Sequence, residues 1–145
     1  MAVDIRVRGY HLDIYQHVNN ARYLEFLEES RWDFFDKTQL ISTFESSNLA
    51  FVMVNLNINY RRPAFVNELV RVTAYFSKVG NKSLQLSQEI ILLKENDCGE
   101  LINDAVIVDA VGTFCLMDQC TEKTILIDGE LRETLTDLIE DAPCQ

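Results

Sequence analysis

The stretch that decides the fold is residues 8–36, which reads RGYHLDIYQHVNNARYLEFLEESRWDFFD. We interpret it as the end of a strand, a short polar loop over residues 11–17, and one long helix. The helix is expected to begin near Val18 or Asn19, because asparagine commonly caps a helix start and both Asn19 and Asn20 stand there.

This helix has one charged stripe and a broad apolar remainder. At about 100° per residue, the charged stripe contains Arg22, Glu25, Glu29, Asp33 and Asp36. The apolar face contains Tyr23, Leu27, Ser30 and Phe34, flanked by Leu24 and Phe35. Such a division is typical of a helix cradled by a sheet, so we expect its aromatic side chains to pack in the core.

A single carboxylate, Asp13, lies a few residues ahead of this helix. A helix N-terminus offers unpaired backbone N–H groups and a partial positive charge. A carboxylate beside such a start provides the parts for acyl-transfer chemistry, because it can attack or activate water while the N–H groups hold a carbonyl oxygen.

The remainder of the chain predicts a run of strands and a terminal helix. The expected strands are residues 4–10, 51–60, 68–79, 84–93, 105–117 and 123–127. A short helix is expected within 37–48, and a last helix after Gly129. With the long strands joined as a meander, the sum is a single α+β domain over residues 1–145, an antiparallel sheet packed on one buried helix.

Three asparagines mark one of these strands. Val54, Leu56, Ile58 and Tyr60 alternate with Asn55, Asn57 and Asn59. The apolar set is expected to face the core. Three asparagines run against strand propensity, so a ligand or a partner subunit is one explanation of the polar face and simple solvation is the other.

Composition narrows the function classes. The net charge is −10, yet residues 1–94 hold 11 basic and 10 acidic side chains and residues 95–145 hold 2 and 13. Nucleic acid is not expected as a partner, because its binding needs a basic face. The first residues, MAVDIRVRG, lack the apolar core of a signal peptide, and no apolar run is long enough to span a membrane. We expect a cytoplasmic protein.

The four cysteines and two histidines predict neither disulfides nor a metal site. Cys98, Cys115, Cys120 and Cys144 match no zinc or thioredoxin spacing, and both histidines lie in one loop. We interpret the cysteines as free thiols of a reducing compartment. No metal and no redox cofactor is expected.

Two motifs resemble one family. Asp13-x-x-x-His17-Val-Asn-Asn, followed by Ala-Arg-Tyr-Leu-Glu-Phe-Leu-Glu-Glu, is similar to the turn and helix of the hotdog-fold 4-hydroxybenzoyl-CoA thioesterase family. Asn59-Tyr60-Arg61-Arg62-Pro63-Ala64 is similar to its next landmark. The resemblance covers almost the whole chain, is weakest after Ile127, and points to the long-chain acyl-CoA thioesterases within the family.

The resemblance implies a hotdog fold, in which the sheet wraps around the long helix, and hydrolysis of acyl-CoA. It implies that Asp13 is the catalytic carboxylate, as nucleophile or as general base, and that the backbone N–H near Asn20 polarises the thioester carbonyl. It also implies an active site at the interface of a homodimer, or of a dimer of dimers forming a homotetramer. Asn59 would then supply contacts, and Arg61 and Arg62 would meet the phosphates of CoA, unless they form only a solvated rim.

Two positions depart from many relatives. His11 stands where many carry an acid, and Gln16 stands where many carry glycine, although the long-chain subgroup shares both features. A glutamine there could change how the turn approaches a carbonyl. His17 is a candidate general base, because its ordinary pKa is near 6.5, or it buttresses the turn.

Two other functions remain open at this point. A non-catalytic acyl-thioester binding module would bind substrate without turnover, and Asp13→Asn would then change little. A dehydratase of hydroxyacyl thioesters would need a histidine and an acid as its pair, for which His17 and Asp13 are available in a single turn.

Overall fold

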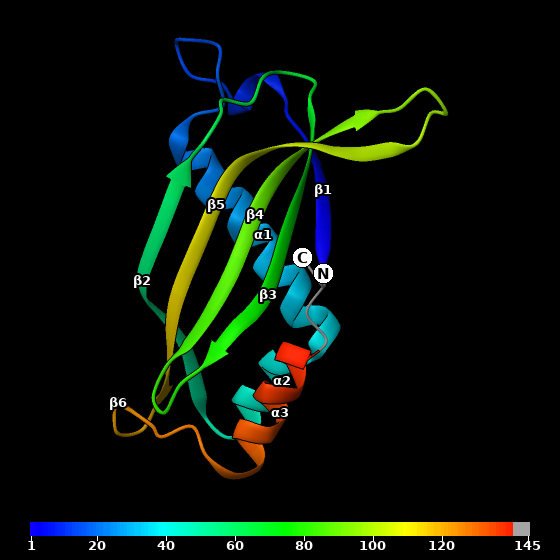
Figure 1. Cartoon of the computed structure of the whole chain (residues 1–145). Coiled ribbons are helices and arrows are strands. Elements are labelled where there is room, and N and C mark those ends of the chain that lie inside the picture. Colours follow the sequence, from blue (N-terminus) through cyan, green and yellow to red (C-terminus); the bar gives the residue numbers. More distant parts are fainter. Residues whose placement is uncertain (141–145) are drawn as a thin grey trace. The chain divides into compact units, whose positions relative to one another are not determined.

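The computed structural model describes residues 1–140 and divides them into two compact units (Figure 1). The first unit comprises residues 1–33, 58–74 and 88–110, and the second comprises 34–57, 75–87 and the chain from 111 onward. Cys144 and the other residues beyond 140 lie outside the described part. The long helix and the four long strands each contribute residues to both units.

The long helix, α1, spans Asn20–Thr38 and begins within two residues of the predicted start. Asn19 caps it, because its Oδ1 accepts the Ala21 N–H at 2.9 Å. In the first unit, Leu27 is fully buried and its carbonyl oxygen accepts a hydrogen bond from Gln88 Nε2 at 2.9 Å. The predicted apolar face is buried, whereas flanking Leu24 is 40% exposed.

The strands form one antiparallel sheet in the order β1-β3-β4-β5-β2, with β6 paired to β5. Their bounds are Ala2–Arg6 (β1), Leu49–Tyr60 (β2), Leu69–Val79 (β3), Leu84–Glu95 (β4), Leu101–Asp118 (β5) and Lys123–Thr124 (β6). The meander prediction holds for β3, β4 and β5. It is wrong for β2, which pairs with β5 at the opposite edge from β1.

Two predicted strands are shorter than the sequence pattern suggested. β1 ends at Arg6, and Gly9–His11 forms a 3₁₀ turn instead of strand. After Arg6 the backbone of Val7 is bonded to residues 67 and 68, with Val7 N donating to Glu68 O and Asn67 N donating to Val7 O. β6 likewise covers only Lys123–Thr124.

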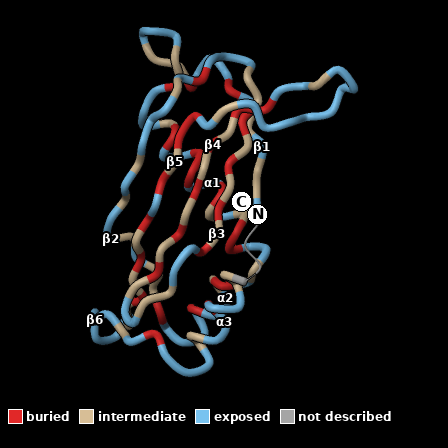
Figure 2. The backbone as a smooth tube through the Cα atoms, viewed as in Figure 1, coloured by how far each residue is buried: buried red, intermediate tan, exposed pale blue. Residues whose placement is uncertain are grey.

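The predicted core face of β2 is only partly correct. Leu56 and Ile58 are half-buried, but Val54 and Tyr60 are 58% and 46% exposed. An edge strand has a neighbour on one side only, so alternation in its sequence does not guarantee burial. Figure 2 shows this exposure along β2, in contrast to the buried positions of β3 and β4.

The second unit has an aromatic core. Phe76 of β3 is fully buried and lies against Phe34 and Phe51, with ring centroids 5.1 and 6.4 Å apart. Phe51 also stacks on Phe114 at 4.3 Å. Helices α2, Leu40–Ser46, and α3, Gly129–Glu140, belong to this unit, and Leu135 of α3 is fully buried.

Candidate functional site

A cavity of about 230 Å³ lies within the first unit, beside the start of α1. Its lining residues are Asp13, His17, Val18, Asn20, Tyr23, Tyr60, Arg61, Arg62 and Pro63. The structure therefore brings together five of the six predicted site residues, and only Asn59 is not among those that line the cavity.

The polar loop forms a tight turn that presents Asp13. A bridge pairs Leu12 with Val18, and Asp13 N donates to His17 O at 2.8 Å. Gln16 takes the left-handed conformation, with φ +62°. That conformation costs a residue other than glycine about 1 kcal/mol. The glutamine thus adopts a backbone conformation that glycine would favour.

One oxygen of the Asp13 carboxylate accepts hydrogen bonds from the turn, and the other is left for a water molecule or a substrate. Its Oδ1 accepts the Tyr15 N–H at 2.8 Å and the His17 N–H at 3.4 Å. Within residues 1–140, no hydrogen bond engages Oδ2. The side chain is half-buried and lines the cavity, so the open oxygen is available to a water molecule or a substrate.

Asn20 provides the free backbone donor of the helix start. Asn19 accepts hydrogen bonds from two N–H groups of the first helical turn. Its Oδ1 accepts the Ala21 N–H, and its carbonyl oxygen accepts the Arg22 N–H at 2.8 Å. The Asn20 N–H has no acceptor among the described residues. Asn20 and Asp13 line the same cavity, so the carboxylate-bearing turn and the first residue of the helix border one space.

His11 positions this turn, a role that the sequence reasoning missed. It is 8% exposed, its carbonyl accepts the Asn19 N–H at 2.8 Å, and its Nδ1 accepts the Arg8 N–H at 2.9 Å. Burial, with the nearby charge of Arg22, lowers the pKa of His11 and favours the neutral ring that this bond requires. Its place two residues before Asp13 was the only signal in the sequence.

Tyr23 also lines the cavity, although the sequence predicted only core packing for it. The side chain is 3% exposed, and its hydroxyl oxygen accepts the buried Ala64 N–H at 2.9 Å. Ala64 O in turn accepts the Val18 N–H at 2.9 Å. These two bonds tie the Arg62–Pro63 segment to the turn that carries Asp13.

The two arginines differ in their surroundings. Arg61 Nε contacts Asp109 Oδ2 at 2.6 Å, and Asn59 Nδ2 donates to Asp109 Oδ1 at 2.9 Å. These hydrogen bonds, Arg61's first, lower the pKa of Asp109. Arg62 Nη2 lies 3.6 Å from Glu68 Oε2, while its Nη1 is buried without a hydrogen-bond partner among the described residues.

His17 lies at the cavity with its ring packed edge-to-face on Phe65, the ring centroids being 5.0 Å apart. The His17 N–H donates to Asp13 Oδ1, and the His17 carbonyl oxygen accepts the Asp13 N–H. This packing favours the interpretation of His17 as a buttress over that of a general base.

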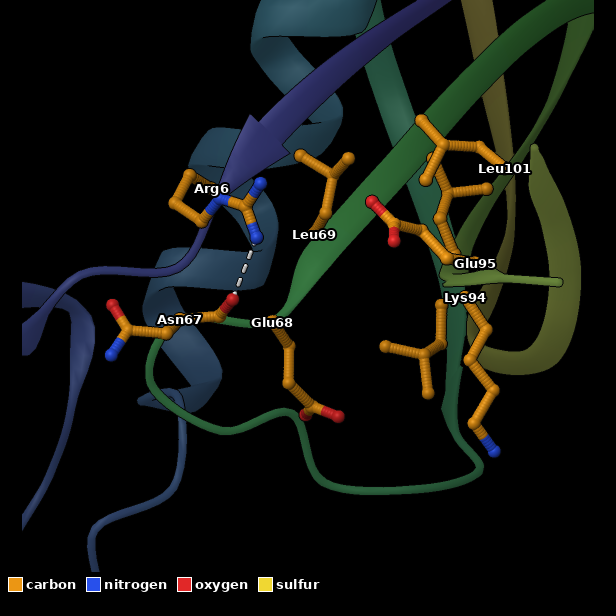
Figure 3. A pocket seen from close by; sticks show the side chains of 9 residues that line it. Arg6, Asn67, Glu68, Leu69, Lys94, Glu95 and Leu101 are labelled. Carbon is orange, nitrogen blue, oxygen red and sulfur yellow. Dashed lines mark hydrogen bonds between the residues drawn. The ribbon is translucent and has the colours of Figure 1, made fainter. Parts of the chain in front are cut away.

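A second pocket of about 290 Å³ is lined in part by the Asn67–Leu69 segment (Figure 3). Arg6 Nη1 donates to Asn67 O there at 2.8 Å, and leucine side chains from β3, β4 and β5 form its apolar lining. Its charged lining residues are Arg6, Glu68, Lys94 and Glu95. Glu68 borders this pocket and also pairs with Arg62 of the first cavity.

Within residues 1–140, no group of three or more His, Cys, Asp or Glu side chains is placed to hold a metal ion. Cys98, Cys115 and Cys120 are free thiols, as predicted. None of the described helices is long and apolar enough to cross a membrane.

The sequence of this chain is similar to the sequences of thioesterases. The sequence model of a family described as the thioesterase-like superfamily matches residues 7–135. The long-chain acyl-CoA thioesterase FadM of Escherichia coli strain K12 is 47% identical over 140 residues, which cover 97% of this chain and 100% of that protein.

Solved structures of probable thioesterases are also similar to this chain. The probable thioesterase YbaW of Escherichia coli is 47% identical, with a TM-score of 0.83, and the match covers 96% of this chain and 98% of that one. A probable thioesterase from Bartonella henselae is 26% identical, with a TM-score of 0.65, and the match covers 88% of this chain and 97% of that one.

Proposed function

This chain belongs to the thioesterase-like superfamily, and we propose that it hydrolyses the thioester of long-chain acyl-CoA to a free fatty acid and CoA. The predicted α+β hotdog fold and the predicted enzyme class, a thioesterase, are confirmed by the family match and the 47% identical relatives. The observation that supports the mechanism is that Asp13 and Asn20 line one cavity, and the 47% identical long-chain acyl-CoA thioesterase supports the substrate.

In the general-base route, the open oxygen of Asp13 takes a proton from water while the water oxygen attacks the thioester carbon. The carbonyl π electrons move to oxygen, and the Asn20 N–H at the helix start stabilises that oxyanion. The tetrahedral adduct then breaks its C–S bond, and the thiolate of CoA recovers the proton from Asp13. Acid and thiol are the products.

In the nucleophilic route, Asp13 itself attacks the thioester carbon and expels the thiolate, which leaves a mixed anhydride that water hydrolyses. Both routes need the same carboxylate in the same place and the same donor for the carbonyl oxygen. We assign His17 to supporting the turn in either route, because its ring packs on Phe65.

The first experiment is a panel of CoA esters with acyl chains from short to long, plus one aromatic ester, followed by release of free thiol. We expect the highest kcat/KM with the long chains. Binding of all esters without thiol release would support the binding-module alternative instead. Hydration of an enoyl thioester without thiol release would support the dehydratase alternative.

Arg62 is proposed to contact the CoA moiety, because Arg62 lines the cavity and its buried Nη1 has no hydrogen-bond partner within residues 1–140. Arg62→Ala should raise KM for CoA esters about tenfold, the effect of losing one charged hydrogen bond, and raise it much less for a thioester without the nucleotide. Arg61→Ala is the matched control: Asp109 already holds Arg61, so a smaller effect is expected.

An equal rise in KM on both kinds of thioester would indicate that Arg62 acts structurally.

Asn59 and Arg61 both donate hydrogen bonds to Asp109. We propose that Asn59 contributes to substrate binding by contacting a partner subunit.

The cavity lies beside exposed apolar side chains of the first unit, namely Ile14, Tyr15, Phe65 and Val66. We propose that a second copy of the chain covers them, in a homodimer or in a dimer of dimers. We also propose a cytoplasmic location and a role in fatty-acid metabolism, which the substrate of the 47% identical relative supports.

A further inference from the structure

Tyr23 has a position in α1 that directs its side chain toward the start of the helix. It is the third residue after Asn20, so both lie on one face. Long side chains in a helix lean back toward the N-terminus, over the preceding turn. Tyr23 is buried, yet it lines the same cavity as Asn20 and Asp13.

The hydroxyl of Tyr23 already accepts one hydrogen bond and can still donate one. Its oxygen accepts the Ala64 N–H at 2.9 Å. A phenol carries one O–H donor besides its acceptor lone pairs. Within residues 1–140, that O–H donates to no acceptor, and the ring is held by Phe26 and Tyr60 with centroids 6.3 and 5.7 Å away.

From this arrangement we propose that the Tyr23 O–H is a second donor to the thioester carbonyl oxygen, beside the Asn20 N–H. The inference rests on the proposed function, because it takes Asp13 and Asn20 as the reacting site. When water or Asp13 attacks the carbon, the oxyanion that forms is held by both donors. Tyr23 keeps its proton throughout, and the thiolate takes its proton as described above.

The electrostatics of the site suit a hydroxyl that donates without ionising. Burial raises the pKa of Tyr23, and the charges of Glu68 and Asp13 act in the same direction. The bond from Ala64 and the charge of Arg62 oppose this shift without reversing it. The phenol therefore keeps its proton at neutral pH.

Tyr23→Phe tests this role, because it keeps the ring and removes only the hydroxyl. We expect kcat to fall by about a hundredfold, the usual effect of losing one oxyanion donor, with KM changed less than about threefold. Tyr75→Phe is the matched control, since Tyr75 is a half-buried tyrosine that lines neither cavity, and its kcat should be unchanged. A Tyr23→Phe enzyme with kcat within twofold of wild type would overturn the proposal.

A second variant separates the donor role from the bond to Ala64. Replacing Tyr23 alone with a fluorinated tyrosine keeps the ring and the hydroxyl oxygen but makes the phenol more acidic. The loss of kcat at alkaline pH should then move to lower pH by about the change in phenol pKa. An unchanged pH profile would show that the hydroxyl serves only as an acceptor for Ala64, and this result decides the matter if Tyr23→Phe fails to fold.

Asp13→Asn, measured in the same assay, distinguishes the two levels of failure. If Asp13→Asn is inactive and Tyr23→Phe fully active, only the inference about Tyr23 fails. If Asp13→Asn retains activity, the proposed site itself is wrong, and the role of Tyr23 falls with it.

Discussion

Asp13→Asn should lower kcat for acyl-CoA hydrolysis by about a thousandfold, within the range that a general base contributes. An amide can neither accept the proton of water nor attack the thioester carbon. The turn should survive, because asparagine retains the Oδ1 that accepts the Tyr15 N–H. Thiol release measures the loss, and circular dichroism checks that the fold is intact.

Asp36→Asn is the matched control for this experiment. Asp36 is an exposed carboxylate of α1, in the second unit, so its neutralisation changes the net charge equally without touching the cavity. We expect Asp36→Asn to keep wild-type kcat.

Substrate binding by Asp13→Asn should persist, because the carboxylate acts in the transition state. A variant with most of its activity left would remove Asp13 from the mechanism.

Phe76→Ala should destabilise the protein by about 3–5 kcal/mol, the cost of deleting a buried aromatic ring. Phe76 is fully buried and its ring lies against Phe34 and Phe51, so the cavity left behind has rigid aromatic walls. Chemical denaturation measures this loss. Val54→Ala, at a position 58% exposed in the same unit, should change stability by less than about 0.5 kcal/mol.

The same variant tests whether residues 1–140 unfold as one domain. Trp32, the single tryptophan, belongs to the first unit, whereas Phe76 belongs to the second. We propose a single cooperative domain, so Phe76→Ala should lower the midpoint followed by Trp32 fluorescence as much as the midpoint followed by circular dichroism. A fluorescence midpoint that stays in place would show that the two units unfold separately.

Local pattern alone was sufficient for the elements around the site. The start of α1 and its buried face follow from Asn19 and from the spacing of Tyr23, Leu27 and Phe34, because helix periodicity and capping are local properties. The strand lengths of β3 and β4 follow from alternation and from the turn at Gly80 in the same way.

Strand pairing was beyond the local pattern. β2 alternates like a half-buried strand, yet it lies at a sheet edge beside β5, where Val54 and Tyr60 remain exposed. Which strands become neighbours depends on contacts between residues far apart in the chain. The sequence of one strand does not contain that information.

The sequence by itself therefore determined the turn that carries Asp13, the helix start that follows it and the family to which both belong. Only the tertiary structure decided that Arg62 and Tyr23 share a cavity with Asp13, and that Arg61, which also lines this cavity, is bound to Asp109. The physical reason is that the sequence pattern gives two adjacent arginines, Arg61 and Arg62, nothing that distinguishes one from the other. Their roles come from burial and from partners that folding brings from other strands and loops.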